Sequence, residues 1–148
     1  MGFADDVRKF QEKALLAANK STNKVVEELF TKVVDKSPTP PGIGGYSEGV
    51  LKNQWYPTSG SGYSGEVGTS ASNIGAGSMS RIKSLLSEDL FYGRDNIVSL
   101  ANNTEQAYYA EVLGWLPGKG TNGWIWSGNV GPYRMVSMSI VEVVGKYG

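Results

Sequence analysis

Carboxylates and aromatic side chains are the residues of this sequence that could do chemistry, and that chemistry would be the cleavage or binding of carbohydrates. Paired acids can cleave glycosidic bonds without histidine or cysteine. The acids near aromatic residues are Glu88, Asp89, Glu105 and Glu111, and the aromatic residues are Tyr108, Tyr109, Trp115, Trp124 and Trp126. Aromatic faces can also stack on sugar rings, which makes carbohydrate binding a second option. Tryptophans in a small domain are more often anchors of the core or of a protein interface, and we favour that interpretation.

The residue types that the chain lacks exclude several kinds of site. It contains no cysteine and no histidine. Disulfides, thiolate nucleophiles and cysteine-type zinc sites are therefore excluded, as are His-based triads and HExxH metalloprotease centres. No run resembles the Asp-rich loop that supplies oxygen ligands to calcium. The sequence predicts no metal ion, no cofactor and no enzyme, with glycan cleavage as the catalytic alternative.

Two glycine-rich segments do not meet the requirements of nucleotide-binding motifs. A Walker A loop needs a glycine, four residues and then Gly-Lys-Ser/Thr, whereas here Leu113 stands at the first glycine position and Gly120 at the hydroxyl position. The segment from Asn73 to Gly77 follows no convincing strand and has no third glycine in the right place for a dinucleotide fingerprint. We therefore expect no nucleotide site.

Charge and hydropathy limit which partners and which cellular location we expect for the chain. The chain has 14 basic and 14 acidic residues, so its net charge of zero gives no global attraction to nucleic acid or to an anionic membrane. Its apolar runs fall far below the roughly 18–20 residues that span a bilayer. The N-terminal residues Met1 to Asp6 are acidic and amphipathic, where a signal peptide would be basic and then apolar. We expect a cytoplasmic product and no membrane partner.

A long helix over residues 3–36 is the first element expected to position these side chains. Apolar residues recur there at steps of mostly three or four, and Ser37-Pro38 supplies a stop. The stripe consists of Phe3, Val7, Phe10, Ala14, Ala17, Val25, Leu29 and Val33. The polar stretch from Asn19 to Asn23 is weak in helix propensity and allows a kink or break. Such a stripe usually packs into a core, and the alternative is a helix shared with a neighbouring subunit.

The middle of the chain is predicted to be a strand followed by a loop. The Pro/Gly-rich segment Pro38 to Gly45 is not expected to form regular structure, and a strand is predicted after it, around Gly49–Thr58. The small-residue segment at about 59–78 is expected to be a flexible hairpin or exposed loop, with a short strand at Glu66–Thr69. It is either a disordered connection or a loop that orders against a partner.

The last third alternates between helical and extended patterns. Helical spacing of apolar residues predicts a second helix over about 78–91, and a strand follows at Ile97–Ala101. Two asparagines close that strand, and a short helical piece should then place Tyr109 and Val112 on one face. The tail, 132–147, fits both a strand and a helix. Its helical stripe is Tyr133, Val136, Ile140, Val144 and Tyr147.

Two segments resemble those of tail-completion (neck) proteins of long-tailed bacteriophages and prophages. In that family a strand is followed by Asn, a Tyr-Ala pair, a Val-Glu pair and Gly, often with Trp next. The corresponding residues here are Asn103, Tyr109-Ala110, Glu111-Val112, Gly114 and Trp115, with both pairs slightly displaced. Upstream, Val50–Trp55 resembles the family's first strand, which also follows a long helix and a Pro/Gly-rich turn.

The resemblance implies a structural role in the virion. We expect residues 1–148 to form a single α+β domain, with a long N-terminal helix and one or two shorter helices packed on a small, mainly antiparallel sheet. The resemblance also favours a helix over a strand for residues 132–147. Copies would form a homo-oligomeric ring, a hexamer, at the neck between the head-side connector or stopper protein and the tail tube or tail-terminator protein, after assembly in the host cytoplasm. DNA would pass through the lumen without sequence-specific binding. Alternatives are a tail-terminator ring and a carbohydrate-binding or glycan-cleaving tail component.

Ring closure needs two different complementary patches on each subunit. The long helix and the segment Asn103–Trp115 are the candidates for one patch, and loops 59–78 and 117–131 would contact neighbours or the tail. The individual interface candidates are Asn103, Tyr108, Tyr109, Glu111, Trp115, Trp55, Trp124 and Trp126.

Overall fold

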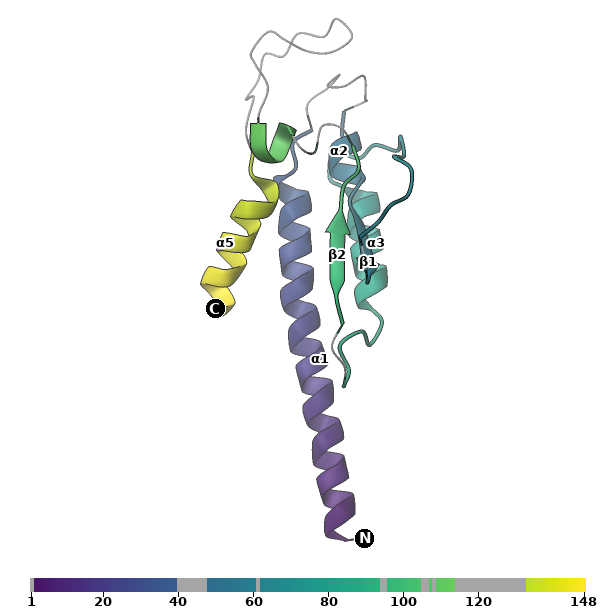
Figure 1. The fold of residues 1–148 in the computed structure, drawn as a ribbon, viewed down its shortest axis with the longest axis vertical. Coiled ribbons are helices and arrows are strands. Elements are labelled where there is room, and N and C mark those ends of the chain that lie inside the picture. Colours follow the sequence, from purple (N-terminus) through teal and green to yellow (C-terminus); the bar gives the residue numbers. More distant parts are fainter. Residues whose placement is uncertain are drawn as a thin grey trace, which may run out of the picture.

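A single long helix, α1 (Phe3–Lys36), is the axis of the fold in the computed structural model (Figure 1). The described residues are 2–39, 48–60, 62–93, 96–104, 107, 109–113 and 133–148. The other elements are α2 (Val50–Asn53), β1 (Tyr56–Ser59), α3 (Ala76–Leu86), β2 (Val98–Ala101), the π-helical turn η2 (Tyr109–Leu113) and α5 (Met135–Tyr147). This is the expected α+β architecture, with a long helix, shorter helices and a small antiparallel sheet.

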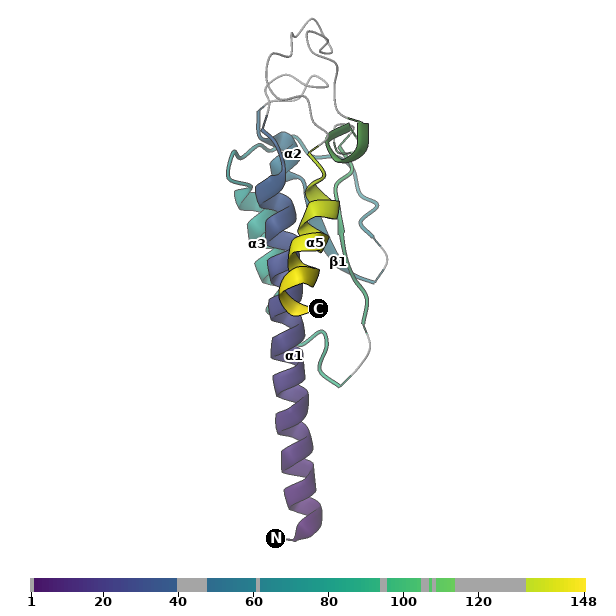
Figure 2. The same ribbon diagram turned by 90° about the vertical axis from the view of Figure 1, so that its left-hand side faces the viewer.

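Helix α5 packs along α1 on one side, while α3 and the β1–β2 pair lie on the other side (Figures 1 and 2). The two strands pair antiparallel, from Tyr56 opposite Ala101 to Ser59 opposite Val98. The core lies where these elements meet. Its buried apolar residues are Phe30, Val33, Val34, Leu51, Trp55, Ile82, Leu86, Leu90, Ala110 and Met135.

The predicted helix over residues 3–36 is confirmed, and the polar stretch in its middle does not break it. Asn19 accepts a hydrogen bond from the backbone N–H of Phe91 (3.1 Å) and donates one to Asp89 (3.2 Å). Asn23 donates to the carbonyl of Leu86 (3.2 Å). These asparagines therefore fasten α1 to the turn after α3, and this tertiary bonding outweighs their low helix propensity.

The predicted strand over Gly49–Thr58 is wrong in its first half. Gly49 has a φ of 84°, and Val50–Asn53 then forms one helical turn before β1 begins. Both Val50 and Leu51 are buried, whereas consecutive residues of a strand point to opposite faces. The helical turn buries this pair together against α1 and α3. Only the second half, with β1, keeps the predicted strand.

The Gly/Ser-rich segment has no strand at Glu66–Thr69, and its end is helical because α3 begins at Ala76. Gln54 bonds across to it, donating to the Ser70 carbonyl (3.0 Å) and accepting from the N–H of Gly68 (3.2 Å). The ring of Tyr63 stacks on Tyr56, with centroids 4.1 Å apart. The described part of the segment is therefore fixed to β1 and the residues before it.

Two further expectations concern the later helices. Helix α3 ends at Leu86, which is earlier than predicted, and Leu90 reaches the core from the turns that follow. The tail is helical, as α5, and the strand alternative is wrong. Strand β2 is confirmed. The loop 117–131 lies outside the described residues.

Candidate assembly surfaces on helices α1 and α5

The N-terminal half of α1 extends beyond the rest of the described chain (Figures 1 and 2). Phe3, Val7 and Phe10 lie on one face of it, since they are four and three residues apart; we name these three the α1 stripe. Their exposed fractions are 85%, 47% and 74%. Full burial of a large apolar side chain stabilises by about 1.5–3 kcal/mol. The single chain does not gain this free energy for Phe3 and Phe10, because both side chains remain largely exposed.

Going from the N-terminus along α1, the contacts with the turn after α3 begin near Leu15 and Asn19. A Cβ added to Gly93 would lie 3.7 Å from Leu15 Cδ1, which places the turn after α3 beside that side chain. Asn19 is buried and bonded to the same turn. Before Leu15 the helix is stabilised mainly within itself, as by the exposed Arg8–Asp5 ion pair at 2.5 Å. Exposed pairs of this kind contribute about 0.2–1 kcal/mol.

The second surface lies on α5, whose exposed side carries several large apolar side chains where a surface helix usually carries polar ones. Its two charged residues turn toward α1, because Glu142 accepts from Lys32 (3.2 Å) and Lys36 (2.7 Å), and Lys146 donates to Glu28 (3.0 Å). The large apolar side chains that α5 leaves exposed are Met138, Ile140, Val141, Val144 and Tyr147, with exposed fractions between 40% and 64%. Tyr147 also donates its hydroxyl to Glu28 on α1. We name these five residues the α5 outer face.

Ion pairing shifts the titration of the groups that join the two helices. The hydroxyl of Tyr147 and the ammonium of Lys146 bond to Glu28 and lower the pKa of its carboxyl. Lys36 and Lys32 do the same to the pKa of Glu142. The carboxylate of Glu28 in turn raises the pKa values of Lys146 and Tyr147. The shifts of Glu28, Glu142 and Lys146 favour the ionised pairs between α5 and α1 near neutral pH, and the raised pKa of Tyr147 keeps its hydroxyl protonated as the donor to Glu28.

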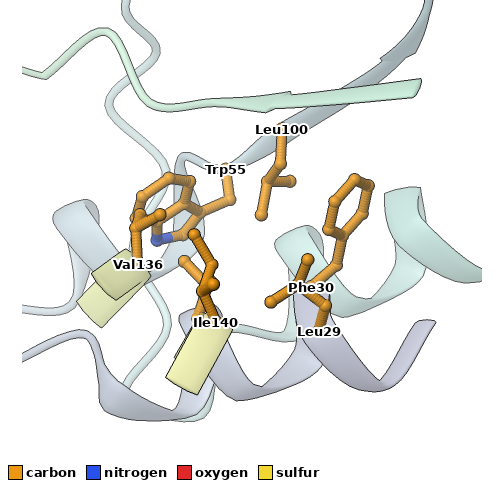
Figure 3. Close-up of a pocket in the computed structure, with 7 residues that line it drawn as sticks. Leu29, Phe30, Trp55, Leu100, Val136 and Ile140 are labelled. Carbon is orange, nitrogen blue, oxygen red and sulfur yellow. The ribbon is translucent and has the colours of Figure 1, made fainter. Parts of the chain in front are cut away.

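An apolar groove lies between α5 and β2 over the surface of α1 (Figure 3). Its cavity measures about 130 Å³ and is lined by Leu29, Phe30, Val33, Trp55, Leu100, Val136 and Ile140. The indole of Trp55 is fixed because its Nε1–H donates to Ser37 Oγ at 2.8 Å. Ile140 belongs both to the groove and to the α5 outer face, so the two apolar areas are continuous.

The structure gives three of the predicted interface residues intramolecular roles. Trp55 is only 4% exposed and belongs to the core, so it offers almost no surface to a partner. Glu111 accepts from the backbone N–H groups of Val136 (2.8 Å) and Ser137 (3.0 Å), which caps the start of α5. Asn103 is exposed and donates to carbonyls of the Gly/Ser-rich segment.

The other predicted interface residues are not described at the level of their side chains. The backbone of Tyr109 belongs to η2, and its side chain lies outside the described part. Tyr108, Trp115, Trp124 and Trp126 lie entirely outside it. The segment Asn103–Trp115 therefore keeps its predicted interface role as a prediction.

Two of the carboxylates considered for catalysis have separate structural roles. Asp89 accepts from Asn19 on α1, whereas Glu111 caps α5. Glu105 lies outside the described residues. Within the described ranges, no three acidic, histidine or cysteine side chains gather in a way that could hold a metal ion. No described helix is both long and apolar enough to cross a membrane.

Sequence reasoning named the α1 stripe but missed the groove and the outward direction of the α5 stripe. The signal for α5 was present in the spacing of Glu142 and Lys146, which lie one turn apart and place both charges on one side. The comparisons with known proteins add no relative, because no family model, curated protein or solved structure matches the chain. The resemblance to tail-completion proteins therefore rests on the two quoted segments.

Proposed function

We propose that this chain is a structural subunit of a ring at the neck of a long-tailed bacteriophage, where it completes the tail and joins it to the DNA-filled head. The observation that carries the proposal is the pair of separate apolar surfaces, the α1 stripe on the projecting helix and the α5 outer face with its groove. A closed ring requires two different patches on each subunit, whereas a two-fold dimer requires a single self-complementary one.

The neck position comes from the resemblance, and the remaining properties are compatible with it. A hexamer would contact the head-side connector or stopper protein at one end and the tail tube or tail-terminator protein at the other. DNA would pass through the lumen, and the net charge of zero suits a passage that must not retain phosphate. The location would be the virion, after assembly in the host cytoplasm.

The first test is the mass and shape of the purified protein over a concentration series, by light scattering and negative-stain imaging. A closed ring of about six subunits is the expected result for a heterologous interface that closes. A strict monomer at every concentration, together with turnover or binding on a glycan array, would overturn the proposal in favour of a carbohydrate-directed tail component.

A second test separates the neck from the tail-terminator role. Deleting the gene from the phage or prophage that encodes it should leave filled heads and finished tails that do not join. Adding the purified protein to that lysate should restore infectious particles. Tails of irregular length in the deletion would instead assign the ring to tail termination, and normal particles would remove both roles.

A further inference from the structure

We infer that the α1 stripe of one copy docks in the groove between α5 and β2 of a second copy. This inference rests on the proposed ring, and it assigns the two halves of the interface. The donor surface is Phe3, Val7 and Phe10, and the acceptor is the groove together with the α5 outer face. An amphipathic helix laid in an apolar groove is a recurrent mode of protein recognition.

The two surfaces match in length. Phe3 to Phe10 spans seven residues, or roughly 10 Å at 1.5 Å per residue. On the acceptor, Val136 to Val144 spans eight residues of α5, or roughly 12 Å. Both ends of the stripe can therefore contact apolar side chains along the same wall.

The groove also matches the size of one ring of the stripe. Its cavity of about 130 Å³ is lined only by apolar and aromatic side chains. An apolar cavity of ~150 Å³ takes up benzene, so one phenyl ring is close to the right filling. Phe10 is the suited side chain, because it has Val7 and Ala14 one turn away on either side, whereas Phe3 stands at the helix end.

The character of the walls excludes a charged occupant. The two charges of α5 are already paired with α1, so no charged residue of α5 faces the groove. The wall on β2 contributes Leu100, and the exposed Ile97 lies just before that strand. A charged helix face would lose its hydration there without gaining a partner, which is costly.

A stripe docked in this groove must come from another copy, because the stripe and the floor of the groove belong to the same continuous helix. Phe10 precedes Leu29 of the groove floor by nineteen residues, or roughly 28 Å along α1. A chain could fill its own groove only by breaking α1 between them. Each copy therefore donates its stripe to one neighbour and accepts a stripe from the other, which is the head-to-tail arrangement of a ring.

Cysteine cross-linking tests this pairing on a clean background, since the chain has no cysteine. Val7→Cys places a thiol on the donor surface and Val144→Cys places one on the acceptor surface. A fusion tag that changes the mass of one variant distinguishes the mixed cross-linked dimer from a dimer of either variant alone. A short bismaleimide should link the two in a mixed sample and link neither protein to itself. Leu16→Cys with Val144→Cys is the control. Leu16 is exposed to the same 47% as Val7, but follows it by about two and a half turns and so lies on the opposite helix face.

A pair of assembly variants gives an independent readout. Phe10→Ser disables the donor and Ile140→Glu the acceptor, so each alone should remain a monomer. Mixed in equal amounts they should form a dimer and nothing larger, because one intact donor and one intact acceptor remain. Leu16→Ser should assemble like the unaltered protein. Circular dichroism of each variant shows whether its fold is retained.

The outcomes separate this inference from the proposed function. Self-linking of Val7→Cys, or dimers of Ile140→Glu alone, would show that stripes pair with stripes and would overturn the inference. A closed ring without the mixed cross-link would overturn it while leaving the proposed function intact. A protein that stays monomeric and gives no product in any sample would overturn both.

Discussion

The two halves of α1 carry the same kind of residue pattern and meet opposite environments. In the C-terminal half, Phe30, Val33 and Val34 are buried under α3, α5 and the residues around Trp55. In the N-terminal half, Phe3 and Phe10 stand in solvent. Periodicity reports which side chains share a face, but it does not report whether the partner of that face belongs to the same chain. The exposed half of the stripe on α1 is therefore the observation on which our proposal of a second copy rests.

The largest expected effect tests this contrast directly. Phe30→Ala should lower the free energy of unfolding by about 3–5 kcal/mol, because it leaves a cavity in the core. Phe10→Ala should change it by no more than about 0.5 kcal/mol in the monomer, since that ring is 74% exposed. Urea unfolding at a concentration below assembly measures both. Equal losses would mean that Phe10 has an intramolecular partner and would remove the contrast.

The next test concerns how tightly the buried half of α1 is packed. Gly75 has a φ of 67°, and a Cβ there would stand 2.5 Å from Val34 Cγ1. Gly75→Ala combines backbone strain with overpacking, and should cost roughly 2–4 kcal/mol.

The matched control for this change is Gly60→Ala. Gly60 has a φ of 93°, and among the described residues, apart from its chain neighbours, no atom would lie within 4 Å of an added Cβ. It should show the strain alone, about 1–2 kcal/mol. Thermal unfolding of the two variants compares them. Equal costs would show that Val34 yields easily and that the core around α1 is loosely packed.

A smaller effect is expected at the C-terminal end of α1, where Ser37 joins the helix to the groove. Its Oγ accepts from the Trp55 indole (2.8 Å) and donates to the Val33 carbonyl (2.9 Å). Ser37→Ala leaves a buried indole N–H without its acceptor, which should cost about 1–3 kcal/mol. Ser87→Ala removes an exposed Ser87–Ser84 bond and should stay within about 0.5 kcal/mol. Equal stabilities of the two variants in urea would mean that water replaces Ser37 beside the indole.

The sequence was sufficient for the elements whose pattern is long and local. Helix α1 follows from spacing, because many residues repeat the same signal. For α5 the spacing fitted both a helix and a strand, and the resemblance favoured the helix that the structure has. The sequence was insufficient for Val50–Asn53, where Gly49 in a left-handed conformation and the burial of neighbouring residues produce a helical turn. A segment this short has too few residues for a period to appear.

Of the candidate surfaces, too, one was predictable from the sequence and one was not. Phe3, Val7 and Phe10 were recognisable as a stripe, whereas the groove is built from residues of α1, β2 and α5 that only tertiary packing brings together. The residue type of Trp55 predicts an interface residue, yet the Ser37 acceptor allows its indole to be buried. The spacing of α5 predicts which residues share one face, but not that its inner side buries Met135 and Val143 and pairs its charges with Glu28, Lys32 and Lys36.

The smallest expected effect concerns those ion pairs, which hold α5 on the buried half of α1. The folded-state pKa values of Glu28 and Glu142 lie below the ordinary value of 4.5. The pairs therefore contribute fully above that value, and their contribution disappears as the pH falls through the lower, folded-state values. The melting temperature should decline on acidification to pH 3 in part for this reason. In the double variant Glu28→Gln, Glu142→Gln the decline should be smaller.

The same measurement decides what orients α5. If the double variant declines with pH as steeply as the unaltered chain, the ion pairs contribute nothing, and the contacts of Met135 and Val143 alone hold the helix. If the decline is smaller and assembly weakens with it, the ion pairs also set which side of α5 faces outward. That second result would connect the charges between the helices to the apolar surface on the opposite side of α5, because a helix that rotates about its axis moves both together.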